Sequence, residues 1–109
     1  MWYYFDMKLK FDQKKIEEIC KKYKVDFLGV FGSVARGEDG PESDVDLLVK
    51  FSDDSDASLL DMVIMEDKIA EIMGRKKVDL VTKDFLSPYI RDGVMEDLIG
   101  IYRKSFEER

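Results

Sequence analysis

The sequence predicts a mixed α/β domain, an α/β or α+β arrangement with a small mixed sheet, from two observations. Three short runs rich in branched and aromatic side chains, at residues 25–31, 45–51 and 77–82, are typical of strands. The segments between and around them carry helix signals, and such alternation indicates helices packed on a sheet. The length of 109 residues suits one core, so we expect residues 1–109 to form a single domain.

The first elements are a helix, a strand and a short second helix. Asp12 is placed to cap a helix that runs to about residue 23. Its apolar positions follow at i, i+3, i+4 and i+7 and share one face: Ile16, Ile19, Cys20 and Tyr23. This spacing makes Cys20 a core residue and not a reactive thiol. A buried strand, Val25–Phe31, comes next, and a short helix starts at Ser33.

A turn-rich loop over residues 37–43 leads to the second strand, Val45–Phe51. The acidic residues of segment 52–58 are interpreted as a solvated loop that caps the next helix, and not as metal ligands. That helix is expected over residues 57–73, ended by Gly74. Its apolar stripe is predicted to be Leu59, Met62, Val63, Ile69, Ile72 and Met73.

The third strand, at residues 77–82, precedes a last helix. Asp84 is the expected cap of that helix, Pro88 lies in its first turn, and it runs to about Ile99. Gly100 is expected to end it, and residues 101–109 are a polar tail of no assigned form. The predicted order is therefore helix, strand, helix, strand, helix, strand, helix.

The charge balance argues against broad nucleic-acid binding. With 24 acidic and 18 basic residues the formal charge is −6, whereas non-specific nucleic-acid binding needs a positive surface. The basic cluster Arg75-Lys76-Lys77 is interpreted as complementing the C-terminus of the preceding helix, with a local basic patch as the alternative.

The residue types that are missing restrict the chemistry further. The chain has no histidine, which removes Ser-His-Asp and Cys-His nucleophiles and histidine-based zinc sites. Cys20 is the only cysteine, so no intrachain disulfide can form and a reducing, cytoplasmic location is expected. No apolar run approaches the length that crosses a bilayer, so we expect no membrane partner.

The most informative feature is a Gly32-Ser33 turn after the first strand, followed by a second strand that opens with Asp44 and Asp46. Residues i and i+2 of a strand share a face, so the two carboxylates would lie side by side, an arrangement that a hard divalent cation makes tolerable. The turn offers backbone N–H groups and a hydroxyl to a phosphate. Either half alone could be an ordinary turn or strand start, but together they indicate nucleotide chemistry.

These residues also resemble a known family. Gly32-Ser33, Ala35-Arg36-Gly37 and Asp44-Val45-Asp46 match the signature of the DNA-polymerase-β-like nucleotidyltransferases. The chain is most similar to the minimal nucleotidyltransferases that are partners of HEPN-domain proteins. The resemblance implies a central twisted sheet with flanking helices and an active site at one sheet edge.

The resemblance also implies the roles of three carboxylates. Asp44 and Asp46 would hold magnesium, with two ions expected, bridging the triphosphate of ATP. Asp79 is the candidate third carboxylate: if its strand lies beside the Asp44 strand, it could hold the second metal and accept the proton of the attacking hydroxyl. The residues themselves favour a partner or cation for Asp79, because it lies in a run of branched side chains.

Three further residues are candidates for nucleotide binding. Gly32 would let the chain approach the phosphates, and Ser33 would supply a hydroxyl and an N–H group. Arg36 either reaches a phosphate or organises the loop through a salt bridge to Asp44 or Glu38.

Two functions in different classes follow. In the first, the chain transfers AMP from ATP to an acceptor hydroxyl, which the resemblance implies is a tyrosine of a HEPN toxin, so the chain acts as its antitoxin. In the second, the same fold is an inert binding module that neutralises its partner by occlusion. The acidic charge fits the first function, since it would suit a basic, RNA-cleaving partner.

Overall fold

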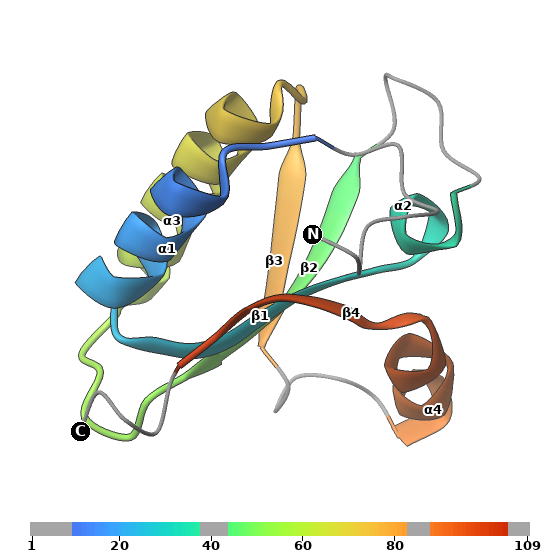
Figure 1. The fold of residues 1–109 in the computed structure, drawn as a ribbon. Coiled ribbons are helices and arrows are strands. Elements are labelled where there is room, and N and C mark those ends of the chain that lie inside the picture. Colours follow the sequence, from blue (N-terminus) through green and yellow to red (C-terminus); the bar gives the residue numbers. More distant parts are fainter. Residues whose placement is uncertain (1–9, 38–43, 83–87, 105–109) are drawn as a thin grey trace.

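The computed structural model describes residues 10–37, 44–82 and 88–104, which form one mixed sheet with helices on both faces (Figure 1). The helices are α1 (Gln13–Lys22), α2 (Ser33–Arg36), α3 (Leu59–Met73) and α4 (Pro88–Asp97). The strands are β1 (Val25–Phe31), β2 (Val45–Phe51), β3 (Val78–Thr82) and β4 (Ile99–Arg103). Their order across the sheet is β3-β2-β1-β4, with β2 and β3 parallel and the other pairs antiparallel. The predicted mixed α/β fold is confirmed.

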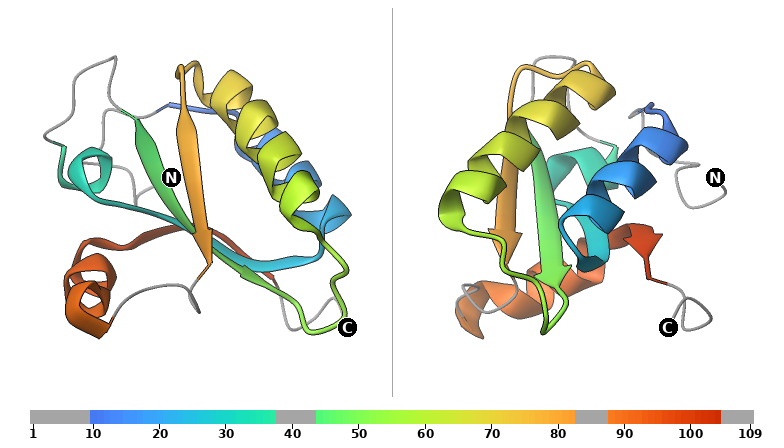
Figure 2. Two further views of the ribbon diagram at one scale, coloured as in Figure 1. Left: turned by 180° about the vertical axis from the view of Figure 1, so that it is seen from behind. Right: turned by 90° about the vertical axis from the view of Figure 1, so that its left-hand side faces the viewer.

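The two faces of the sheet are covered differently. Helices α1 and α3 lie side by side on one face, whereas α2 and α4 lie on the other, as the views of Figures 1 and 2 agree. The main core fills the first face, where β2 contributes Val45, Leu47 and Val49, all fully buried. On the second face, Leu48 and Val94 form a smaller apolar cluster with the residues packed against them. The second face is therefore only partly apolar, which leaves room on it for polar side chains.

Helix ends are fixed by the capping groups that the sequence indicates. The Asp12 carboxylate accepts hydrogen bonds from the backbone N–H groups of Lys14 and Lys15, at 3.0 and 3.3 Å. Ser58 and Asp61 form a reciprocal capping box at the start of α3. Gly74, with φ +65°, ends α3 in the left-handed conformation that glycine adopts without strain.

The C-terminal prediction was wrong in one respect. Helix α4 ends at Asp97, and Ile99–Arg103, expected as a helix end and tail, forms a fourth strand beside β1. Gly100 serves not as a helix stop but as a point of close packing, since a Cβ there would lie 3.1 Å from the Phe27 ring. The expected cap Asp84 lies outside the described residues, while Pro88 is the first residue of α4, in its first turn as predicted.

The predicted apolar stripe of α3 is only partly buried. Ile69 and Met73 are in the core, and Met62 and Ile72 pack against it. Leu59 and Val63 are instead 76% and 51% exposed. A helix has about 3.6 residues per turn, so the Val63 side chain is rotated by roughly a third of a turn from that of the buried Ile69. Leu59 is the first residue of the helix. Both positions therefore lie at the margin of the buried stripe.

One further hydrogen bond joins α3 to the sheet. Glu66 of α3 reaches the outermost strand, where its Oε2 accepts a hydrogen bond from the Leu80 N–H at 2.8 Å. Among the described residues, no helix has the length and apolar character needed to traverse a bilayer.

Burial makes the thiol of Cys20 inert, as its place in the core suggests. The side chain is fully buried, and desolvation, followed by the negative charge of Glu17, raises the pKa of Cys20 to about 12. Because the thiolate is the reactive form, we expect native protein at pH 8 to react with Ellman's reagent far more slowly than protein in denaturant. Equal rates in the two states would contradict this placement.

Candidate active site

The turn after β1 is built around Gly32. Its φ of +77° and ψ of −154° belong to a region that only glycine adopts without strain. The short helix α2 starts at the next residue, and its first backbone bond runs from Arg36 N–H to Gly32 C=O at 3.2 Å. A Cβ on Gly32 would lie 2.8 Å from Oδ2 of Asp46. The turn and the Asp46 carboxylate are thus in close contact, which brings the two halves of the motif together.

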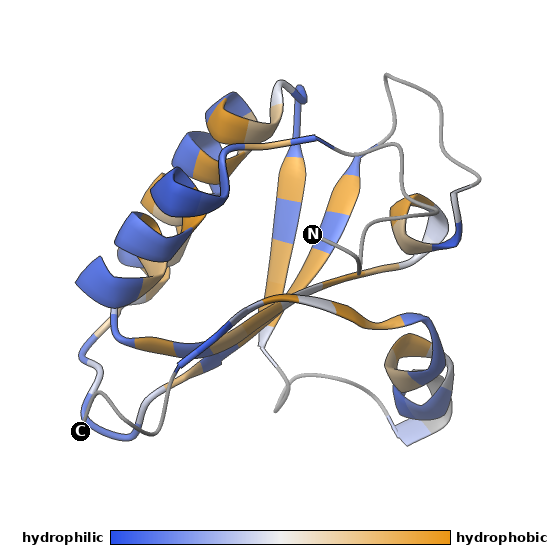
Figure 3. Ribbon diagram, in the orientation of Figure 1, coloured by the Kyte–Doolittle hydropathy of each residue, from blue (hydrophilic) through white to orange (hydrophobic). Residues whose placement is uncertain are grey.

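Asp46 and Asp79 are direct neighbours in the parallel pairing of β2 and β3. Residues paired in this way project to the same face of a sheet. Val45 and Leu47, on either side of Asp46, are buried in the main core, so both carboxylates project to the opposite face. In Figure 3 each of these strands carries a hydrophilic band within an otherwise hydrophobic run. The condition set for Asp79, that its strand lie beside that of Asp44, is confirmed.

Asp44 adds a third carboxylate at the start of β2. It is exposed and stands two residues before Asp46, whose carboxyl group is partly buried. Burial raises the pKa of Asp46, and the negative charges of Asp79 and then Asp44 raise it further. Asp46 is therefore close enough to both Asp79 and Asp44 for their charges to disfavour its ionised form.

The donor set fits magnesium that arrives with a nucleotide better than a closed protein cage. No group of three or more His, Cys, Asp or Glu side chains in the described ranges is arranged to hold a metal ion by itself. Magnesium, however, commonly takes one or two carboxylates and completes its coordination with water and substrate phosphates. Asp44, Asp46 and Asp79 offer hard oxygen donors of that kind.

Lys77 also lies beside these acids, a position that was not expected from the sequence. Its Nζ is 3.6 Å from Oδ1 of Asp79. The basic cluster was interpreted as complementing the end of α3, but that helix ends at Met73 and has no basic residue in its last turn. The sequence did contain a signal for this contact. Lys77 and Asp79 are two residues apart at the start of an expected strand, and such residues project to the same face.

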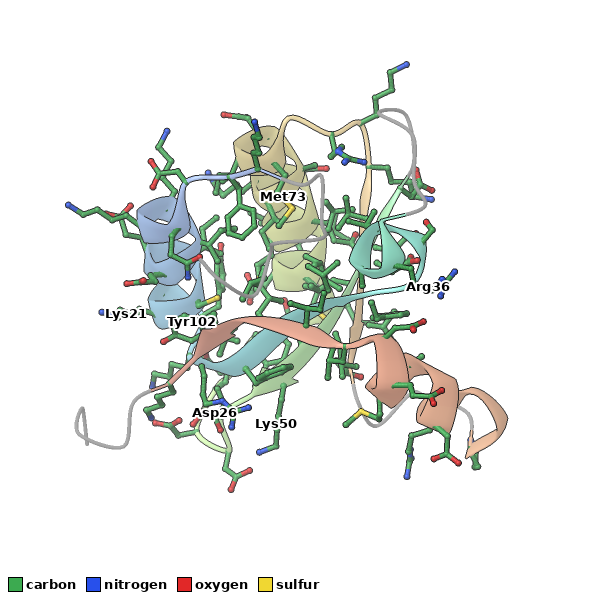
Figure 4. The ribbon with its side chains drawn as sticks, turned by 45° about the vertical axis from the view of Figure 1, so that its right-hand side comes forward. Lys21, Asp26, Arg36, Lys50, Met73 and Tyr102 are labelled. Carbon is green, nitrogen blue, oxygen red and sulfur yellow. The ribbon has the colours of Figure 1, made fainter. Side chains whose placement is uncertain are left out.

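Arg36 pairs with an acid that the sequence did not suggest. Its Nη1 lies 2.5 Å from Oδ2 of Asp97, at the end of α4. Figure 4 shows Arg36 between α2 and α4. Of the partners expected from the sequence, Glu38 lies outside the described residues. The observed pair joins the Gly32 turn to the last helix.

Comparison with known proteins gives a consistent result. Residues 13–101 match the nucleotidyltransferase domain family. MJ1379 of Methanocaldococcus jannaschii, provisionally named a protein adenylyltransferase, is 40% identical over 90 residues, which cover 81% of this chain and 89% of that protein. The protein adenylyltransferase MntA of Thermococcus cleftensis is 36% identical over 85 residues, covering 78% and 83% of the two chains.

A solved structure shares the fold. It is described as a tri-AMPylated HEPN toxin of Shewanella oneidensis in complex with its MNT antitoxin. The matched chain superposes with a TM-score of 0.59 at 18% identity, covering 88% of this chain and 73% of that one. At this identity the likeness concerns the fold alone.

The contact between Gly32 and Asp46 predicts a difference between two glycine substitutions. Gly74→Ala should destabilise the protein by about 1–2 kcal/mol, because its φ is positive but nothing lies within 4 Å of the added Cβ. Gly32→Ala should destabilise it more, because the added Cβ also meets the Asp46 carboxylate. Urea denaturation of both variants measures the difference. Adding Asp46→Ala should recover part of the Gly32→Ala loss, and additive effects would contradict the contact.

The crowding of carboxylates predicts that Asp46→Asn raises the melting temperature at pH 7 in a metal chelator. A pKa that is raised by folding means that the ionised form opposes folding at neutral pH. Asparagine removes that charge while keeping the shape. The gain should vanish as the pH falls below the ordinary value of 3.8, where Asp46 is protonated in both states. A gain that persisted there would rule out charge repulsion as its cause.

Proposed function

The chain belongs to the nucleotidyltransferase domain family, and on that premise we propose that it transfers AMP from ATP, with magnesium, to a hydroxyl group of a protein partner. The observation that carries the proposal is the pairing of Asp46 with Asp79 on one face of the sheet, beside Asp44 and the Gly32 turn. Nucleotidyl transfer depends mainly on positioning and on neutralising the charge of the triphosphate. The site brings together residues suited to both tasks.

Each group has a distinct task in this proposal. The backbone of Gly32 and Ser33 approaches the phosphates, which a side chain on Gly32 would obstruct. Asp44, Asp46 and Asp79 would hold magnesium, which would neutralise part of the charge of the triphosphate. The acceptor hydroxyl oxygen attacks the α-phosphorus of ATP, the carboxylate of Asp79 accepts the hydroxyl proton, and pyrophosphate leaves.

The acceptor in the proposal is a tyrosine of a HEPN-type toxin, which the transfer silences. Two observations support this partner: a relative 36% identical is named a protein adenylyltransferase, and the fold is shared with an MNT antitoxin in complex with an AMPylated HEPN toxin. The formal charge of −6 also suits a basic, RNA-cleaving partner.

A second candidate function is neutralisation by occlusion, with a site that has lost its activity. The observation that favours it is a set of exposed apolar side chains on α3, which suit contact with another protein. They are Leu59, Leu60 and Val63, exposed by 76%, 69% and 51%. The three carboxylates argue against it, because occlusion does not need acids gathered on one face.

Asp44→Asn separates the two functions. We expect the wild-type chain, given labelled ATP and magnesium in an extract of its source organism, to label one protein band. Asp44→Asn should reduce that label by at least two orders of magnitude, because it removes a carboxylate that the transfer requires. The matched control is Asp56→Asn, which makes the same change at an exposed position in the loop before α3 and should leave the label intact.

The outcomes of this experiment test the acceptor and the transfer reaction separately. If the label appears in a small molecule or in RNA, AMP transfer is supported but the proposed protein acceptor is wrong. If no fraction is labelled while a partner still co-purifies with both chains, the transfer proposal fails and occlusion stands.

A further inference from the structure

We propose that Lys77 binds the phosphate chain of the nucleotide and that, before the nucleotide arrives, it is the counter-ion of Asp79. This inference rests on the proposed function, since it concerns the same site, and it adds a cationic residue to it. The site residues to which the proposed function gives a role in holding magnesium are all negatively charged. A triphosphate approaching them needs a positive group in addition to any metal.

The backbone places Lys77 beside the three acids. In the parallel pairing, Val45 is opposite Val78 and Asp46 is opposite Asp79. The Val45 N–H donates to the Lys77 C=O at 3.2 Å, so the backbone of Lys77 is bonded to β2 where the pairing begins. Asp44 and Lys77 are the residues that immediately precede the first pair, Val45 and Val78.

The side chains of these four residues lie close to one another. Asp46 and Asp79 are paired on β2 and β3 and project to one face, and Asp44 and Lys77 each stand two residues earlier, just before these strands. The negative charge of Asp44 acts on the Asp46 carboxyl group and raises its pKa, as expected for neighbouring acids. The ion pair between Nζ of Lys77 and Oδ1 of Asp79, at 3.6 Å, places the ammonium group beside Asp79. Neighbouring strands lie about 4.8 Å apart, so the four groups form a compact array of three acids and one base.

The Lys77–Asp79 ion pair is weak enough for Lys77 to leave Asp79 and bind a phosphate instead. The two side chains are 63% and 42% exposed, and exposed pairs stabilise a fold by about 1 kcal/mol or less. A triphosphate carries more negative charge than one carboxylate, and lysine is a common phosphate ligand with a mobile ammonium group. When the nucleotide binds, Lys77 moves to its phosphates and Asp79 becomes free to hold metal.

The test compares Lys77→Gln with Lys76→Gln. The control removes the same charge from the adjacent exposed lysine, which lies one position farther from the strand pairing. Binding of ATP with magnesium is measured by titration calorimetry, and AMP transfer to the partner is measured over a range of ATP concentrations. We expect Lys77→Gln to weaken ATP binding and to raise KM roughly tenfold or more, with a smaller change in kcat.

Two further measurements exclude a merely structural role. Lys77→Arg should restore much of the ATP affinity, because it restores the positive charge. Lys77→Gln should bind AMP nearly as well as the wild type does, since the contact is with the outer phosphates. Its melting temperature should fall by little, as expected for an exposed ion pair.

The failure of this inference is distinguishable from failure of the proposed function. If the wild type transfers AMP, and both glutamine variants bind ATP as the wild type does, Lys77 is not a phosphate ligand while the transfer proposal stands. If the wild type neither binds ATP with magnesium nor transfers AMP, both proposals are overturned.

Discussion

The parallel pairing of β2 with β3 in a single register is the constraint on which the site depends. It sets Asp46 beside Asp79 and, by the same alternation, directs Val45, Val78 and Leu80 into the main core. A slip of one residue in either strand would expose that strand's core side chains and bury its carboxylate. The burial of apolar surface under α1 and α3 therefore specifies the position of the acids on the opposite face.

This arrangement gathers charge at the expense of stability. Burial and two neighbouring carboxylates raise the pKa of Asp46, and the Gly32 backbone closes against the same carboxylate in a conformation open only to glycine. Such crowding of carboxylates is common where a protein must hold a cation, because the bound cation offsets the repulsion. Lys77 and Arg36 are positively charged residues near this region, and in the described structure each is paired with a carboxylate, that of Asp79 and that of Asp97.

Much of the fold could be predicted from the sequence, because the local sequence signals agree with the tertiary structure. The cap Asp12, the capping of α3 by segment 52–58, the stop at Gly74 and the strands β1 to β3 follow from local residue chemistry, although α3 begins two residues later than expected. The fourth strand was missed because Gly100 is also a common helix terminator, and only the Phe27 ring packed against it reveals its purpose.

The remaining errors concern contacts between distant parts of the chain. The partnership of Arg36 with Asp97 spans 61 positions, and no local pattern specifies it. Lys77 was assigned to the helix it follows in the chain, whereas its functional neighbours lie across the sheet. The exposed face of α3 was misjudged because apolar spacing alone does not show how wide a stripe the sheet can cover.

Among the described residues, β3 is an edge strand of the sheet, and an edge can pair with a foreign strand through its backbone groups. The Glu66 carboxylate accepts the Leu80 N–H hydrogen bond and so covers part of this edge with negative charge. The same bond that steadies the strand carrying Asp79 thus discourages copies of the chain from joining edge to edge into larger aggregates.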